Sequence, residues 1–233
     1  TDTINLSPFS SITVNGRKGN DTIILDATLL DMGDKITVNG GDDDDTLILN
    51  DASETTAHTY KLDGNLVGRT GKLITFADIA ALVVNAGDKN DALTVAAPST
   101  ATVSTTFDGG ADADSITFED ANGATARAYE LDGTKVGRSG GLVTYANVTS
   151  IAIDAGSKND TLALKAAPTL GTTVTFNGDK SGTVNADANT LDLTLFNPAN
   201  VELDAASPTG FGGSVASGMT KVLEFTEVNK IDA

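Results

Sequence analysis

The segment YKLDGNLVGRTGKLITF at residues 60–76 returns as YELDGTKVGRSGGLVTY at residues 129–145, so the offset is 129 − 60 = 69. The Asn-Asp pair at residues 90–91 returns at residues 159–160 with the same offset. Internal repetition at a fixed spacing is typical of repeat architectures, in which each repeat packs only on its neighbours. The chain therefore carries a long internal repeat with this offset.

A shorter pattern lies inside the long repeat. A strand-like triplet precedes Asn or Asp, and Gly or Ala follows, as in ITVNG at residues 12–16 and again at residues 36–40. The Asn or Asp of this pattern recurs every 22–24 residues, at Asn15, Asn39, Asp63, Asn85, Asp108, Asp132, Asp154 and Asn177. The long repeat therefore contains three short ones.

Short strand patterns that end in turn residues and recur at this spacing predict the coils of a parallel β-solenoid (β-helix). A propeller blade needs about 40 residues or more, and a sandwich would not keep one residue type at each corner. We expect an all-β fold with one domain over residues 1–233, built from about ten coils of 22–24 residues in three-coil repeats. The repeats cover about residues 11–79, 80–148 and 149–220, and the coils over residues 180–233 are irregular. The usual crossover chirality predicts right-handed winding.

The composition excludes several classes of function. The 233 residues include 32 acidic and 15 basic ones, which gives a formal net charge of −17, and there is no Cys. This charge argues against nucleic acid and anionic membranes as partners, and the lack of Cys excludes disulfides and thiolate metal sites. No apolar run approaches the length of a membrane span. A chain of this size with no Cys, a strong acidic excess and few Lys favours a secreted bacterial protein, and hence an extracellular or cell-surface location.

Equivalent residues of successive solenoid coils stack above one another. The repeated Asn and Asp residues are therefore expected to form one ladder, with side chains bonded to the backbone at each turn. A second column follows six residues later: Asp21, Asp45, Arg69, Asp91, Asp114, Arg138, Asp160 and Thr183. Arg69 and Arg138 are each expected to lie between the two Asp residues that flank them in this column and to bond to both carboxylates.

Two pairs of column carboxylates have no Arg between them, Asp21 with Asp45 and Asp91 with Asp114. Carboxylates stacked about 5 Å apart repel each other unless a proton or a cation neutralises them. The surrounding segments read GRKGNDTI at residues 16–23, GGDDDDTL at residues 40–47 and GGADADSI at residues 109–116. They resemble the calcium-binding nonapeptide of haemolysin-type (RTX-like) proteins, Gly-Gly-x-Gly-x-Asp-x-apolar-x.

This resemblance implies calcium between stacked turns, with six to eight oxygen ligands. The aspartates that match the motif or stand at its second conserved Gly are Asp21, Asp43, Asp45, Asp91, Asp112 and Asp114. The alternative is a solvated acidic turn that Lys18, Lys89 and mobile ions neutralise. More broadly, the chain is similar to long repetitive bacterial surface proteins with Asn-Asp-Thr turns in β-solenoids.

No segment of the chain predicts a catalytic site. A catalytic site should break the repeat, and the prominent carboxylates of this chain obey it. His58 is the only His and is expected to be a surface turn residue. Phe76, Tyr145 and Phe225 occupy equivalent positions and are expected to stack in the core, which leaves few exposed aromatics to bind sugars. We therefore expect no enzymatic activity, and a carbohydrate-active enzyme is the least favoured alternative.

The two ends of the chain have matching patterns. TDTINL at residues 1–6 resembles NDTLAL at residues 159–164, and the chain stops with IDA at residues 231–233. No capping helix is predicted, and uncapped solenoid ends expose unpaired strand edges. We expect a head-to-tail homopolymer in which the next subunit's residues 1–6 complete the coil of residues 230–233. The residues at these ends are Thr1, Asp2, Ile4, Leu6, Ile231, Asp232 and Ala233.

The leading interpretation is therefore a secreted structural protein that forms an extracellular filament or surface layer. The second is a calcium-binding adhesin module of a larger surface protein, with surface glycans as partners. A section of a longer repetitive protein that ends at a repeat boundary would show the same match between its ends, so this alternative stays open.

Overall fold

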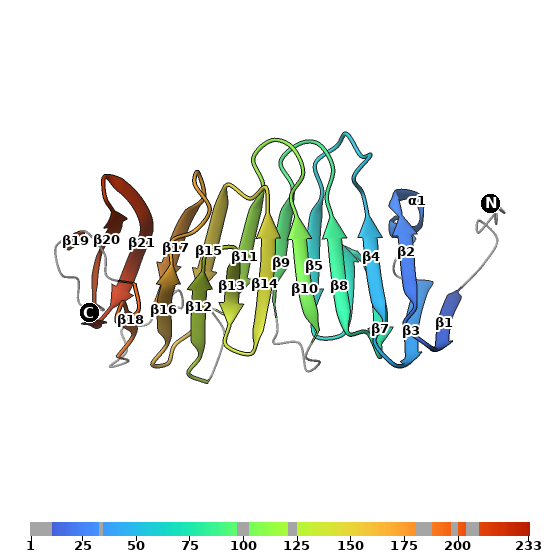
Figure 1. Cartoon of the computed structure of the whole chain (residues 1–233), viewed down its shortest axis with the longest axis horizontal. Helices are drawn as coiled ribbons and strands as arrows, with labels where there is room; N and C mark the ends of the chain where they lie inside the picture. Colours follow the sequence, from blue (N-terminus) through green and yellow to red (C-terminus); the bar gives the residue numbers. More distant parts are fainter. Residues whose placement is uncertain are drawn as a thin grey trace.

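The computed structural model describes residues 11–32, 35–96, 103–120, 125–179, 188–196, 200–203 and 210–233. Its strands lie side by side along the long axis of the molecule, and the first and last strands are at opposite ends (Figure 1). The predicted assembly residues Thr1, Asp2, Ile4 and Leu6 lie outside the described residues, as does Thr183.

The strands form two sheets. The order in the 12-stranded sheet is β1 (Ile12–Lys18), β3 (Ile36–Asp42), β7 (Lys72–Ala77), β6 (Leu66–Arg69), β5 (Thr59–Asp63), β9 (Ala92–Val95), β11 (Ser115–Glu119), β15 (Ser150–Asp154), β17 (Thr173–Asn177), β21 (Thr220–Val228), β20 (Phe211–Ser217) and β19 (Asn200–Leu203). The order in the 10-stranded sheet is β2 (Thr22–Asp26), β4 (Thr46–Asn50), β8 (Ala81–Asn85), β10 (Ser104–Asp108), β14 (Gly141–Ala146), β13 (Lys135–Arg138), β12 (Ala128–Asp132), β16 (Thr161–Ala166), β18 (Thr190–Asp192) and β22 (Lys230–Asp232).

Neighbouring strands are parallel, except that β6, β13 and β20 each run antiparallel to both of their neighbours. In the described part of the chain, the one helix is the four-residue α1 (Ala27–Leu30). No helix among these residues is long and apolar enough to cross a membrane. The prediction of an all-β chain with long parallel sheets is confirmed.

The core lies between the two sheets. Inner strands such as β4 and β8 alternate buried and half-buried residues, as expected when one face of a strand is covered. Tyr60 on one sheet contacts Phe107 on the other, with ring centroids 6.3 Å apart, and Tyr129 and Phe176 repeat this contact at 6.2 Å. The predicted core residues Phe76, Tyr145 and Phe225 are all buried.

One short repeat in three is not a coil. The chain passes from sheet to sheet one strand at a time, but β5–β7, β12–β14 and β19–β21 each fold back as a three-stranded antiparallel unit within one sheet. Gly64 and Gly71 have φ of 63° and 82° in the two tight turns of the first unit. Type I′ and related hairpin turns require such angles, so the Asp-Gly pair at residues 63–64 forms a hairpin here instead of a coil corner.

The three-stranded units alternate between the sheets. The first and third lie in the 12-stranded sheet, and the second lies in the 10-stranded sheet. The single strands β8–β11 separate the first two units, and β15–β18 separate the second from the third. After each unit the chain crosses between the sheets five times before the next unit begins. Because five is an odd number, the next unit lies in the opposite sheet. The long repeat thus exchanges the roles of the two sheets.

Candidate functional site

The most regular polar feature is a set of buried aspartates at the start of strands. Asp45, Asp91, Asp114 and Asp160 are each no more than 1 % exposed. The backbone N–H of Asp21 donates to Oδ1 of Asp45 over 2.7 Å, and the N–H of Asp91 donates to Oδ1 of Asp114 over the same distance. The N–H groups of His58 and Arg127 donate likewise to Asp91 and Asp160. Each carboxylate therefore accepts a backbone hydrogen bond from the preceding layer.

The second carboxylate oxygen is buried without a hydrogen-bond partner in Asp45 and Asp114, and the same is true of Oδ2 of Asp21. A Cβ on Gly40 would lie 2.4 Å from Oδ2 of Asp45 and 2.0 Å from the carbonyl oxygen of Asp78. Gly109 has the same surroundings, with Asp114 and the carbonyl of Asn147 both at 2.5 Å. In both places two acceptor oxygens converge on one glycine.

The arrangement of Gly40 with Asp45, and of Gly109 with Asp114, occurs a third time at Gly178. Here an amide replaces the carboxylate. Asn189 occupies the position, and its Oδ1 accepts the N–H of Asp160 over 2.8 Å. Its Nδ2 donates to the carbonyl oxygen of Glu227 over 3.0 Å, next to Gly178. Asp78, Asn147 and Glu227 all have left-handed backbone, with φ between 53° and 57°. The amide of Asn189 thus supplies the donor that an ionised carboxylate lacks.

Burial shifts the pKa of three of these aspartates, Asp91, Asp114 and Asp160, upward. Burial raises the pKa of Asp114 to about 6; the N–H bond from Asp91 opposes this, and the charges of Asp91, Asp112 and Asp108 add to it. Burial likewise raises the pKa of Asp160 to about 6 and raises the pKa of Asp91. When Asp114 is protonated, its Oδ2 can donate to a carbonyl oxygen at Gly109, as the Nδ2 of Asn189 donates at Gly178.

Gly40 is a position where one added methyl group should have a large effect. We expect Gly40→Ala to lower the free energy of unfolding by about 1–3 kcal/mol or more, because the new Cβ overlaps backbone. Gly141→Ala is the control, since nothing lies within 4 Å of its added Cβ. Urea unfolding followed by circular dichroism measures both. Equal stability of the two variants would contradict the close packing at Gly40.

The aspartates predicted to bind calcium fall into two groups. Asp21 with Asp45 and Asp91 with Asp114 are adjacent, as the expected stacking requires, but the Oδ1 atoms of Asp45, Asp91 and Asp114 already accept N–H bonds. Asp43 and Asp112 lie on the outer turns: Oδ2 of Asp43 accepts the N–H of Gly19, and Asp112 pairs with Lys89 at 3.2 Å. Among the described residues, no group of three or more His, Asp or Glu side chains is arranged to hold a metal ion.

The expected single Asn/Asp ladder is corrected to separate pairs. Asn15 lies beside Asn39, Asn85 beside Asp108, and Asp154 beside Asn177. The ladder is broken at Asp63, which pairs antiparallel with Leu66, and at Asp132, which pairs antiparallel with Lys135. These two residues end the first strand of a three-stranded unit, so they are displaced from the column that equal spacing predicts.

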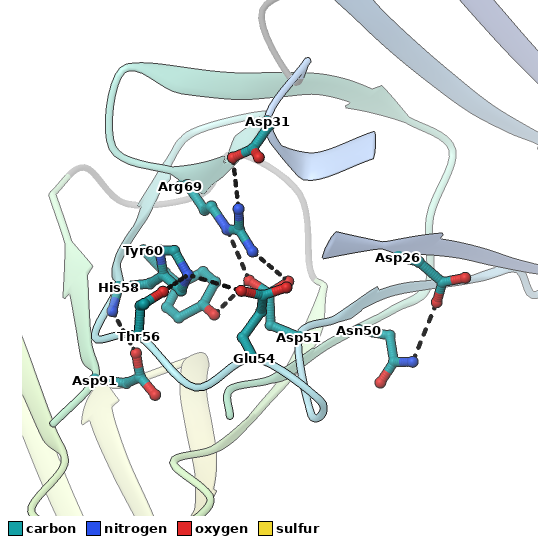
Figure 2. Close-up of polar contacts among 10 residues, drawn as sticks. All are labelled: Asp26, Asp31, Asn50, Asp51, Glu54, Thr56, His58, Tyr60, Arg69 and Asp91. Atoms are coloured by element: carbon teal, nitrogen blue, oxygen red, sulfur yellow. Dashed lines mark hydrogen bonds and ion pairs between the residues drawn. The ribbon is translucent and has the colours of Figure 1, made fainter. Parts of the chain in front are cut away.

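The predicted positions of Arg69 and Arg138 between column aspartates are also wrong. Arg69 bonds to Asp51, which is fully buried, through Nε at 2.9 Å and Nη2 at 2.7 Å, and its Nη1 bonds to Asp31 at 2.5 Å (Figure 2). Tyr60, which pairs with Arg69 across the hairpin, donates its hydroxyl to Asp51 over 2.6 Å. Arg69 is the last residue of β6, which runs antiparallel to its neighbours. Its side chain is therefore buried against Asp51 and does not join the column of aspartates.

The same cluster returns at the equivalent positions of the next long repeat. Arg138 donates through Nε to Asp120 over 2.7 Å, and the Tyr129 hydroxyl donates to Asp120 over 2.6 Å. Arg138 also lies over the ring of Phe118, at 5.8 Å from its centroid. Burial and the bond to the carboxylate raise the pKa of both tyrosines. Sequence reasoning missed the carboxylates, although Asp51 and Asp120 share the offset of the repeat.

His58 lies beside the first cluster but is not arranged as a catalytic base. Its Nε2 lies 3.1 Å from Oγ1 of Thr56 and 3.8 Å from Oε2 of Glu54, so one nitrogen faces both groups (Figure 2). A relay needs the nucleophile on one ring nitrogen and the orienting carboxylate on the other. The ring packs edge-on against Tyr60, with centroids 6.3 Å apart. This geometry is that of a turn residue packed against the cluster.

Comparisons of the chain with protein-family models, with curated proteins and with solved structures found no match.

Proposed function

We propose that this chain is a secreted structural protein whose subunits stack head to tail into an extracellular filament or surface layer. In this proposal the two sheets are the walls of one closed, right-handed β-solenoid, and the polar side chains are structural. The observation that carries the proposal is the partial exposure of apolar side chains on the end strands. The inward-facing Ile12 and Val14 of β1 and Ile231 of β22 are only half-buried, whereas Ile36 and Val38 of β3 are buried.

The described residues leave a free strand edge at both ends of both sheets. No described strand covers the outer edges of β1, β2, β19 and β22. An unpaired edge presents a row of N–H and C=O groups that another strand can pair with. Because the edges at the two ends differ, a contact between them is heterologous and does not close on itself, and it therefore propagates as a filament.

Self-association tests this proposal. We expect sedimentation velocity to show species that grow with protein concentration, and Ile12→Asp to stop this growth, because it places a charge in the apolar contact. Ile24→Asp is the control, since Ile24 is 54 % exposed on β2 and faces outward. A single monomeric species at every concentration would overturn the proposal, and equal growth of both variants would exclude β1 as part of the contact.

A second candidate is a calcium-binding adhesin module of a larger surface protein, with surface glycans as ligands. The observation that favours it is the backbone of the outer turns. Gly41 and Asp43 have φ of 109° and 83°, and Gly110 and Asp112 have φ of 89° and 73°. Left-handed backbone at these positions fits the places where the nonapeptide has glycine. Calcium would then bind to the exposed outer carboxylates and leave the buried ones in place.

Calcium removal tests the second candidate. An ion that binds only the folded chain must stabilise it, so we expect calcium to raise the melting temperature and a chelator to reverse the rise. Asp43→Asn should reduce the effect. Magnesium at the same concentration is the control for general screening of the 17 excess negative charges. A melting temperature that neither ion changes would rule out calcium as a structural ligand.

A further inference from the structure

Two edge strands at opposite ends of the described structure, β22 and β1, belong to different sheets. β22 ends the 10-stranded sheet, and β1 begins the 12-stranded sheet. β22 follows a three-stranded unit, as β8 and β15 do. The backbone agrees: the N–H groups of Asn229 and Lys230 both donate to the carbonyl of Asn189, as those of Ala80 and Ala81 donate to the carbonyl of Asp45. β22 is therefore equivalent to β8 and β15.

The strand that stacks on each of these positions has a constant form. β10 pairs with β8, and β17 pairs with β15, and both end in Asn or Asp followed by Gly. β1 has the same form, with Asn15 followed by Gly16. In the described chain β1 has no strand on its outer edge, and β22 has none on its outer edge. β1 is thus the kind of strand that the pattern places beside β22.

We propose that the partner of β22 is β1 of a second copy of this chain, turned by half a turn, so that each sheet continues as the other sheet of the next copy. This inference rests on the proposed stacking of subunits and defines its contact. The registers of β15 with β17 and of β18 with β22 fix the alignment. Ser11 of the second copy faces Lys230, Ile12 faces Ile231, and Thr13 faces Asp232.

Packing supports this register. Ile12 and Ile231 are both half-buried and both packed against the hydrophobic core of their own end. In the proposed contact each covers the other, as Ile151 covers Val174 within the chain. Thr13 and Asp232 then lie side by side on the outer face. Burying two half-exposed Ile side chains removes apolar surface from water at about 25 cal/mol per Å².

Charge also supports the contact. Residues 11–20 contain Arg17 and Lys18 and no acidic residue, which gives +2. Residues 220–233, which form β21 and β22, contain Glu224, Glu227, Asp232, Lys221 and Lys230, which gives −3 + 2 = −1. A basic edge strand that meets an acidic segment favours head-to-tail contacts and disfavours contacts between like ends. This local sign change stands out in a chain with a net charge of −17.

The exchange of sheets keeps the internal pattern intact. The three-stranded units lie in the 12-, 10- and 12-stranded sheets in turn, so the next unit belongs on the continuation of the 10-stranded sheet. The first unit of the next copy, β5–β7, lies in the 12-stranded sheet of that copy. The half-turn places this sheet on the continuation of the first copy's 10-stranded sheet. The sheet that joins at β22 and β1 then contains 10 + 12 = 22 of the described strands from the two copies.

Cysteine cross-linking tests the contact, and the Cys-free chain makes each product unambiguous. Thr13→Cys and Asp232→Cys would put the two Cα atoms about 4.8 Å apart, within the range that disulfides bridge. We expect a mixture of these two variants to form a covalent dimer on mild oxidation. Ile24→Cys with Asp232→Cys is the matched control, because that pair meets only if β2 stacks on β22 without exchange of the sheets.

The outcomes separate this inference from the proposed function. Cross-linking of the Thr13 pair supports the half-turn contact. Cross-linking of the Ile24 pair overturns it but leaves stacking intact. If neither pair cross-links while filaments form, the β22–β1 contact is wrong and the structural role stands. If neither pair cross-links and sedimentation shows only monomer, both proposals fail.

Discussion

Asp51→Ala is expected to lower the free energy of unfolding by about 3–5 kcal/mol, the cost of removing one partner from a buried ion pair. Asp51 is fully buried and receives three hydrogen bonds, two from Arg69 and one from Tyr60. Without it, the Arg69 guanidinium keeps its bond to Asp31 among the described residues and remains buried next to a hydroxyl that has lost its acceptor. Urea denaturation of the variant and the parent chain measures the loss.

Two further variants make this prediction specific. Lys221→Ala removes an ion pair with Glu224 whose side chains are about half exposed, and should cost less than about 1 kcal/mol. Replacing both partners, Asp51→Leu with Arg69→Met, should cost less than Asp51→Ala alone, because no charge is left buried without a partner. If the double replacement costs the sum of the two single ones, the cluster does not act as one unit.

Asp114→Asn is expected to stabilise the chain by about 2 kcal/mol at pH 7. The pKa of Asp114 is raised to about 6 in the folded chain, so the folded state binds this proton more tightly than the unfolded state does. The corresponding stability is fully present below the unfolded pKa of about 4 and is lost as the pH rises through 6. An amide is neutral at every pH and can donate to the carbonyl of Asn147, as Asn189 donates to Glu227.

Unfolding measured from pH 4 to pH 8 tests this prediction. The parent chain should lose stability as the pH rises, and Asp114→Asn should remove one group's share of that loss. Asp44→Asn is the control, since it removes the same charge from an exposed outer turn. If Asp114→Asn is less stable than the parent at pH 7, or has the same pH dependence, the carboxyl does not act as a proton-bearing group.

Much of the fold could be predicted because repetition constrains it. The constant offset of the long repeat, the parallel strands, and the pairing of Asn15 with Asn39 and of Asn85 with Asp108 all follow from repeated patterns. The hairpin at residues 63–66 could not, because a coil corner and a tight hairpin favour the same Asp-Gly pair. Only pairing between distant strands distinguishes the two.

The candidate site was predictable in position but not in chemistry. The adjacency of Asp91 and Asp114 follows from equal spacing, whereas the backbone bonds that occupy their Oδ1 atoms depend on how each turn bends. Arg69 illustrates a different failure, because the column places it between Asp45 and Asp91 whereas its side chain bonds to Asp51. A reversed strand changes which face a side chain occupies, and spacing carries no information about strand direction.

Electron microscopy of the purified protein over a range of concentrations tests the central claim, that this chain is a structural subunit that stacks through its strand edges. We expect unbranched filaments of constant width, with strands spaced about 4.8 Å along the axis and no break at the subunit junction. Rods of one subunit's length at every concentration, or filaments whose strands are interrupted at each junction, would contradict it.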